Sequence, residues 1–150
     1  MPARVIALGQ RSAGDDGVGF AVLDRLRQGG VPPDVDLRRA EEDAALIGLL
    51  ETPHPVVIVD AVLGSPPGRV LDLAPADLAA SGVRPVSTHG LGVVRAIELA
   101  RVVAVGEVSP SIRIVGITID RPARYEDGLS PRVEAAVALA AARVRALVAG

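Results

Sequence analysis

The side chains in this sequence that could do chemistry are a few carboxylates and one histidine, each beside the end of a predicted strand or helix. Asp15 and Asp16 stand in a glycine-rich turn, Asp60 follows four β-branched residues at 56–59, and His89 precedes a predicted helix. Carboxylate oxygens and a neutral imidazole suit a divalent metal, and so small a ligand set leaves coordination positions open. The pattern predicts a metal site assembled from three separate loops.

Each of these residues also has a structural interpretation. An aspartate in the turn could cap the following helix, because acidic groups are favourable at a helix N-terminus. One aspartate suffices for a cap, so the second of the pair is left without a structural role. Asp60 could bind backbone N–H groups of the next loop, since a carboxylate beside an apolar core needs a hydrogen bond, a counter-charge or a metal. His54, at the other end of the strand from Asp60, is interpreted as a bystander.

Composition excludes several other kinds of chemistry. The absence of Cys removes disulfides, thiolate metal sites and thiol nucleophiles. All 16 basic residues are Arg, which excludes lysine Schiff bases and a P-loop lysine. The glycine-rich turn carries Asp15-Asp16 where a phosphate-binding loop needs Lys-Ser/Thr, so nucleotide binding is not expected. A net charge of −2 with one Phe and one Tyr predicts no nucleic-acid partner.

The elements that must position these residues alternate between strands and helices. The predicted strands cover 5–8, 35–39, 56–59, 69–73 and 111–118, and the predicted helices cover 20–28, 44–50, 91–103 and 131–147. Asp60 is expected to end its strand, and the strand at 69–73 is expected at the sheet edge beside that strand. Ser130 and Pro131 have the residue types preferred at the start of the last helix.

This alternation predicts an α/β fold, namely a three-layer αβα sandwich with a mainly parallel, twisted central sheet. The length of 150 residues and the lack of a linker predict one domain over 1–150. The strands at 5–8 and 56–59 are expected to be central and parallel, with their carboxyl ends at the edge where such sheets bind ligands. No apolar run is long enough to span a bilayer and no signal peptide precedes the first strand, so we expect a cytoplasmic protein without membrane contact.

Four short motifs, in order along almost the whole chain, resemble the nickel–iron hydrogenase maturation endopeptidases. The motifs are an acidic pair followed by glycines, a strand ending in Asp-Ala with a later Pro-Gly turn, a Ser-x-His loop, and a Gly-Leu-Ser-Pro helix entry: Asp15-Asp16-Gly17-Val18-Gly19, Val59-Asp60-Ala61 with Pro67-Gly68, Ser87-Thr88-His89-Gly90-Leu91, and Gly128-Leu129-Ser130-Pro131-Arg132-Val133. The single domain is therefore expected to be of the hydrogenase maturation protease type.

The resemblance implies a function and a set of site residues. By resemblance, Asp16, Asp60 and His89 contact the metal, and the same three are the candidates for catalytic groups, with no nucleophile assigned. The implied reaction is removal of the C-terminal extension of a hydrogenase large-subunit precursor after nickel insertion, an aspartyl-type endopeptidase activity in the family's usual description. The implied partner is that precursor, and the implied metal is a divalent ion, the nickel that the precursor carries.

Two positions depart from the family pattern and motivate an alternative function. Gln10 replaces the usual Asn, and the turn after the second strand, Arg39-Ala40-Glu41-Glu42-Asp43, is acidic where the family has a Gly-Thr turn. A diverged, non-catalytic module that recognises a metallated partner is therefore the alternative to a protease. A third possibility is an unrelated α/β hydrolase of small molecules, but the sequence contains no Gly-x-Ser-x-Gly elbow to support it.

Overall fold

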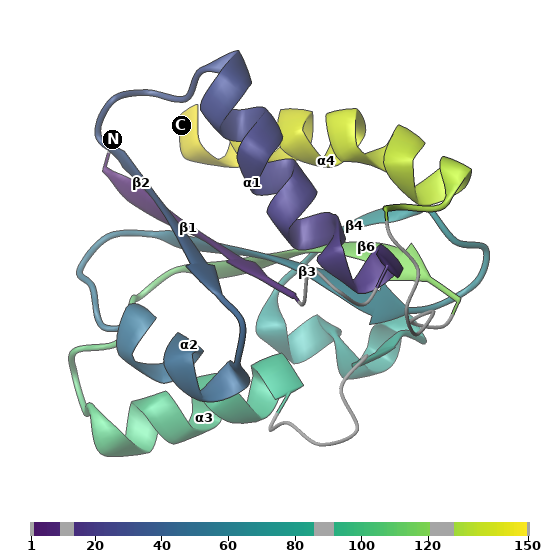
Figure 1. The fold of residues 1–150 in the computed structure, drawn as a ribbon. Coiled ribbons are helices and arrows are strands. Elements are labelled where there is room, and N and C mark those ends of the chain that lie inside the picture. Colours follow the sequence, from purple (N-terminus) through teal and green to yellow (C-terminus); the bar gives the residue numbers. More distant parts are fainter. Residues whose placement is uncertain (1, 10–13, 86–91, 121–127, 150) are drawn as a thin grey trace.

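Helices cover both faces of a single sheet in the computed structural model of the chain, which describes residues 2–9, 14–85, 92–120 and 128–149. Helices α1 (Val18–Gly29) and α4 (Pro131–Ala149) lie on one face, and α2 (Asp43–Leu49) and α3 (Gly92–Val103) lie on the other (Figure 1). This arrangement confirms the predicted αβα sandwich. None of the helices within these described ranges is both long and apolar enough to cross a membrane.

The sheet is mainly parallel, as the alternation of strands and helices predicts. The strands within the described residues are β1 (Ala3–Leu8), β2 (Val35–Ala40), β3 (Val56–Leu63), β4 (Val70–Leu73), β5 (Arg84–Pro85) and β6 (Ile112–Ile119). Their order is β2-β1-β3-β6-β4, and β5 pairs with the end of β3. β1 is parallel to both β2 and β3, and β3 is parallel to β6. The prediction that the first and third strands are central and parallel is therefore confirmed.

The two largest apolar cores lie one on each face of the sheet and explain why these elements pack as they do. One core joins the sheet to α1 and α4 through residues such as Val5, Val59 and Val137, and the other joins it to α2 and α3 through Ile6 and Ile58. Because neighbouring residues of a strand point to opposite faces, central strands buried on both sides must be almost continuously apolar. The composition of β1 and β3 follows from this requirement.

Two expectations about strands are wrong. Asp60 does not end its strand, because β3 continues to Leu63, where it remains paired with β6. β4 is an edge strand as expected, but it is antiparallel to β6 and does not lie beside β3. β3 already has β1 on one side and β6 on the other, so no position beside it remains for the full length of β4. The region 74–85 also contains two short 3-10 helices, η2 (Pro75–Asp77) and η3 (Ala79–Ser81), before β5.

An ion-pair cluster on β1 and β2 gives a prediction about pH. Asp36 accepts hydrogen bonds from Arg4 Nε at 3.0 Å and from Arg38 Nε at 3.0 Å. Partial burial by itself would raise the pKa of Asp36, but the hydrogen bonds and charges of Arg38 and Arg4 outweigh it and hold that pKa below 3.8. The stabilisation is therefore present above pH 3.8 and is lost as the pH falls through the folded-state pKa.

We expect the free energy of unfolding of Asp36→Asn to depend less steeply on pH below about 4 than that of the unaltered protein. Urea unfolding at pH 5 and pH 3 measures this difference. Glu107→Gln, which removes an exposed carboxyl group elsewhere, is the control. Identical pH slopes for Asp36→Asn and the unaltered protein would contradict the assignment.

Candidate functional site at the carboxyl edge of the sheet

Asp60 lies on β3 just beyond the residues that pair with β1. β1 pairs with β3 as far as Val59, and β5 begins its pairing at Val62, so Asp60 lies between these two pairings. Alternation along the strand places its half-buried side chain on the face of Ile58 and Val62. Folds with a parallel sheet bind their ligands at the carboxyl ends of the strands. Asp60 lies beside the carboxyl end of β1, so its carboxylate is a candidate ligand-binding group.

A glycine leaves space on the same face as Asp60. Gly116 of β6 is the register partner of Asp60, and a Cβ atom built on Gly116 would lie 3.3 Å from Val62. With glycine at this position, β6 contributes no side chain next to the carboxylate. The sequence pattern of β6 predicted a strand, but it did not reveal that its glycine is adjacent to the candidate acid.

Asp16 is carried by a 3-10 turn, η1 (Gly14–Gly17), that packs against β3. Two glycines allow this approach. A Cβ atom on Gly9 would collide with the carbonyl oxygen of Asp16, and one on Gly19 would collide with the carbonyl oxygen of Leu8 and lie 3.0 Å from that of Val59. The main chain on either side of Asp16 is thus in direct contact with the strand ends. Asp16 itself is half-buried.

Asp15 does not cap the helix that follows it, which was the structural interpretation of the acidic pair. The N-cap of α1 is Gly17, and it makes no side-chain capping hydrogen bond. Asp15 instead accepts hydrogen bonds from the backbone N–H of Ser130 at 2.7 Å and from Ser130 Oγ at 2.8 Å. Its negative charge therefore lies at the start of α4, where the helix dipole favours an anion. Ser130 was predicted only as the N-cap of the last helix, and its pairing with Asp15 could not be seen in the sequence.

His89 and the Ser-x-His motif lie outside the described residues, so the predicted trio of Asp16, Asp60 and His89 remains a prediction. Among the residues that the structure does describe, no three His, Cys, Asp or Glu side chains gather into a metal-binding group. The residues flanking 86–91 are described. Pro85 pairs with Val62 near the end of β3, and Gly92 begins α3.

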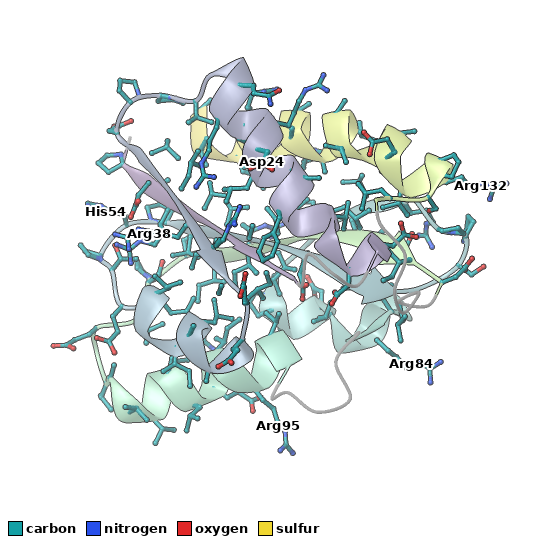
Figure 2. All side chains as sticks on the ribbon, viewed as in Figure 1. Asp24, Arg38, His54, Arg84, Arg95 and Arg132 are labelled. Atoms are coloured by element: carbon teal, nitrogen blue, oxygen red, sulfur yellow. The ribbon has the colours of Figure 1, made fainter. Side chains whose placement is uncertain are left out.

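His54 lies at the opposite end of β3, as expected for a bystander. Its backbone carbonyl accepts a hydrogen bond from Ser109 Oγ at 2.7 Å, in the turn that leads to β6. Figure 2 shows His54 on the side of the molecule opposite Arg84 of β5, which pairs with the carboxyl end of β3. His54 therefore lies away from Asp60 and provides a control position.

The acidic turn that departs from the family pattern follows β2 and leads into α2. Glu41 and Glu42 are exposed, and the carbonyl of Glu42 accepts a hydrogen bond from the N–H of Ala45 at 3.1 Å as the helix begins. The preceding Arg39 places its guanidinium 4.7 Å from the centre of the Phe20 ring in α1. Arg39 therefore connects this turn to α1, the helix that directly follows η1.

Comparison with known sequences identifies one family. The sequence profile of the hydrogenase maturation protease family matches residues 42–146 of the chain. This range includes Asp60 and Ser130 but begins after the acidic pair. No curated protein sequence gives a significant match.

Several solved structures of hydrogenase maturation proteases have a fold similar to that of this chain. The hydrogenase maturating endopeptidase HybD from E. coli is 23% identical, with a TM-score of 0.78 over 99% of this chain and 92% of that chain. The [NiFe] hydrogenase maturation protease HybD from Thermococcus kodakarensis is 22% identical, with a TM-score of 0.77 over 98% and 99%. The HycI protease from T. kodakarensis KOD1 is also 22% identical, with a TM-score of 0.74 over 99% and 93%.

Proposed function

Because the chain belongs to the hydrogenase maturation protease family, we propose that it removes the C-terminal extension of a nickel–iron hydrogenase large-subunit precursor after nickel insertion. As a member of this family it is a peptidase-type hydrolase. The observation that carries the proposal is Asp60, which lies within the matched range and on the central strand β3, directly after the residues that pair with β1. The cytoplasm is the compartment that we propose for this reaction.

The proposed contact between enzyme and substrate is the nickel that the precursor already holds. Asp16, Asp60 and His89 would supply oxygen and nitrogen ligands to that ion, which suits the donor preferences of a divalent transition metal. Two observations support the proposal: η1, which carries Asp16, contacts β3, which carries Asp60, and both carboxylates are half-buried. A metal ion held by these residues would supply Lewis-acid chemistry, by polarising a carbonyl group or by activating a water molecule for hydrolysis.

Incubation of the purified protein with a nickel-loaded large-subunit precursor tests the proposal. We expect the mass of the precursor to fall by that of its C-terminal extension, and no change in a precursor that lacks nickel. A precursor that binds but keeps its full mass would favour the non-catalytic recognition module. A precursor that neither binds nor shortens would contradict the proposed substrate.

The proposal also predicts weak metal binding by the isolated protein. Two carboxylates and one imidazole, with no thiolate, provide only part of a coordination shell, so the precursor must supply the rest. We expect calorimetric titration with Ni²⁺ to give a Kd weaker than about 1 μM. Nanomolar affinity without precursor would show instead that the protein holds a metal of its own.

A further inference from the structure

We propose that Asp15 is a positioning residue whose bond to Ser130 holds the turn bearing Asp16 at the carboxyl edge of the sheet. The inference rests on the proposed function through the role given to Asp16, but the contact itself lies within the described residues. We call the two hydrogen bonds between Asp15 and Ser130 the Asp15–Ser130 link. It joins segments that are 115 residues apart in sequence.

The link is anchored on a rigid element. Both oxygens of the Asp15 carboxylate are engaged, Oδ1 by the Ser130 N–H at 2.7 Å and Oδ2 by Ser130 Oγ at 2.8 Å. The Ser130 carbonyl accepts a hydrogen bond from the N–H of Glu134 at 2.8 Å, so the first turn of α4 is formed at this residue. Val133 and Val137 then bury the helix against the sheet. Asp15 is therefore bound to a part of the molecule that the core holds in place.

Asp16 is also restrained by Gly9, the residue that follows β1. Its carbonyl group packs so closely on Gly9 that a Cβ atom there would collide with it. The turn thus contacts the residue that follows β1 through Asp16 and the start of α4 through Asp15. A ligand carboxylate must be positioned to within a fraction of an ångström to be effective, and supporting hydrogen bonds supply that precision. The Asp15–Ser130 link has the geometry for this role.

A second link to α4, from the C-terminal end of α1, provides a matched control. Arg145 of α4 donates hydrogen bonds to the carbonyl of Gly30 at 3.3 Å through Nε and to that of Arg25 at 3.4 Å through Nη2. It joins α4 to the C-terminal end of α1, whereas the Asp15–Ser130 link joins α4 to the turn before the N-terminal end of α1. Loss of either link should weaken the contact between α1 and α4, but only one link holds the turn of Asp16.

The experiment compares Asp15→Ala, Asp15→Asn and Arg145→Ala with the unaltered protein, well below their melting temperatures. Backbone hydrogen exchange is measured in the absence of substrate, and shortening of the nickel-loaded precursor is measured separately. We expect both alanine variants to have a lower Tm. Asp15→Ala should raise amide exchange in Gly14–Gly17 at least about tenfold and lower kcat/KM by about 10- to 100-fold. Arg145→Ala should instead raise exchange at the end of α1 and keep kcat/KM within about twofold.

The asparagine variant shows whether Asp15 acts through its hydrogen bonds to Ser130 or through its negative charge. An amide at residue 15 can accept the Ser130 N–H and donate to Ser130 Oγ, so Asp15→Asn should retain kcat/KM to within about threefold. If Asp15→Asn loses as much activity as Asp15→Ala, Asp15 acts through its charge and the positioning role is wrong. If Arg145→Ala loses as much activity as Asp15→Ala at the same fall in Tm, the Asp15–Ser130 link contributes to stability alone.

The exchange measurement keeps this inference separate from the proposed function. If the unaltered protein does not shorten the precursor, the proposed function fails, whereas hydrogen exchange in Gly14–Gly17 still tests the link. Unchanged exchange there in Asp15→Ala would overturn the inference whatever the activity of the protein.

Discussion

Replacing Asp60 with asparagine is expected to abolish shortening of the nickel-loaded precursor while leaving the protein folded. The amide has the shape of the carboxylate but not its charge, and a neutral amide oxygen is a poor ligand for a divalent transition metal. Because removal of groups that merely support a ligand costs about 10- to 100-fold, loss of the ligand should lower kcat/KM by at least about 100-fold. Mass spectrometry of the precursor over time measures the activity, and far-UV circular dichroism checks the fold.

Two further variants show whether the effect belongs to the site. Asp16→Asn should behave like Asp60→Asn, because the two carboxylates are proposed to contact the same ion. His54→Ala should keep full activity, since His54 lies beyond the opposite end of β3, where its backbone carbonyl bonds Ser109. Full activity in Asp60→Asn would show that the reaction does not depend on Asp60, and this would contradict the proposed function.

Replacing Gly19 with alanine is expected to have the largest effect on stability. The added Cβ atom would collide with the carbonyl oxygen of Leu8 and lie 3.0 Å from that of Val59, and both are backbone atoms of central strands. Backbone in the middle of a sheet cannot move aside as a flexible side chain can, so α1 must shift as a whole. We expect the free energy of unfolding to fall by about 3 kcal/mol, as for other overpacked sites.

Gly48→Ala is the matched control for this substitution. Gly48 also lies in a helix, but a Cβ atom there would have nothing within 4 Å. Alanine has the higher helix propensity, so this variant should gain about 0.5–1 kcal/mol. Urea unfolding measures the free energy of unfolding of both variants and of the unaltered protein. If Gly19→Ala is as stable as the unaltered protein, Gly19 is not packed as closely against Leu8 and Val59 as the structure shows.

Local patterns were sufficient to predict the main elements and the layers of the fold. The β-branched run at 56–59 predicted a buried central strand, because apolar residues on both faces of a strand are typical of the middle of a parallel sheet. The apolar spacing from Val133 to Val144 predicted a helix with one face on the core, and Ser130 with Pro131 predicted where it begins. These properties depend on residues close together in sequence, and the structure confirms them.

Strand pairing required the tertiary structure, because it depends on which neighbouring positions are already taken. The run 69–73 has the pattern of an edge strand, but nothing within it distinguishes pairing with β3 from pairing with β6. The positions beside β3 are occupied by β1 and β6, so β4 pairs antiparallel with β6. For the same reason Asp60 lies within β3, since its pairing with β6 extends the strand to Leu63.

In the candidate site, too, the sequence predicted local features of the acidic pair, and only the tertiary structure showed its partner. The sequence identified Asp15 and Asp16 as one more carboxylate than a helix cap needs, and it predicted that one of them has a structural role. It assigned that role to the nearest helix, because a sequence pattern contains only local candidates for a partner. The partner is Ser130, 115 residues away, and only the packing of α1 beside α4 brings its N–H and hydroxyl groups to the Asp15 carboxylate.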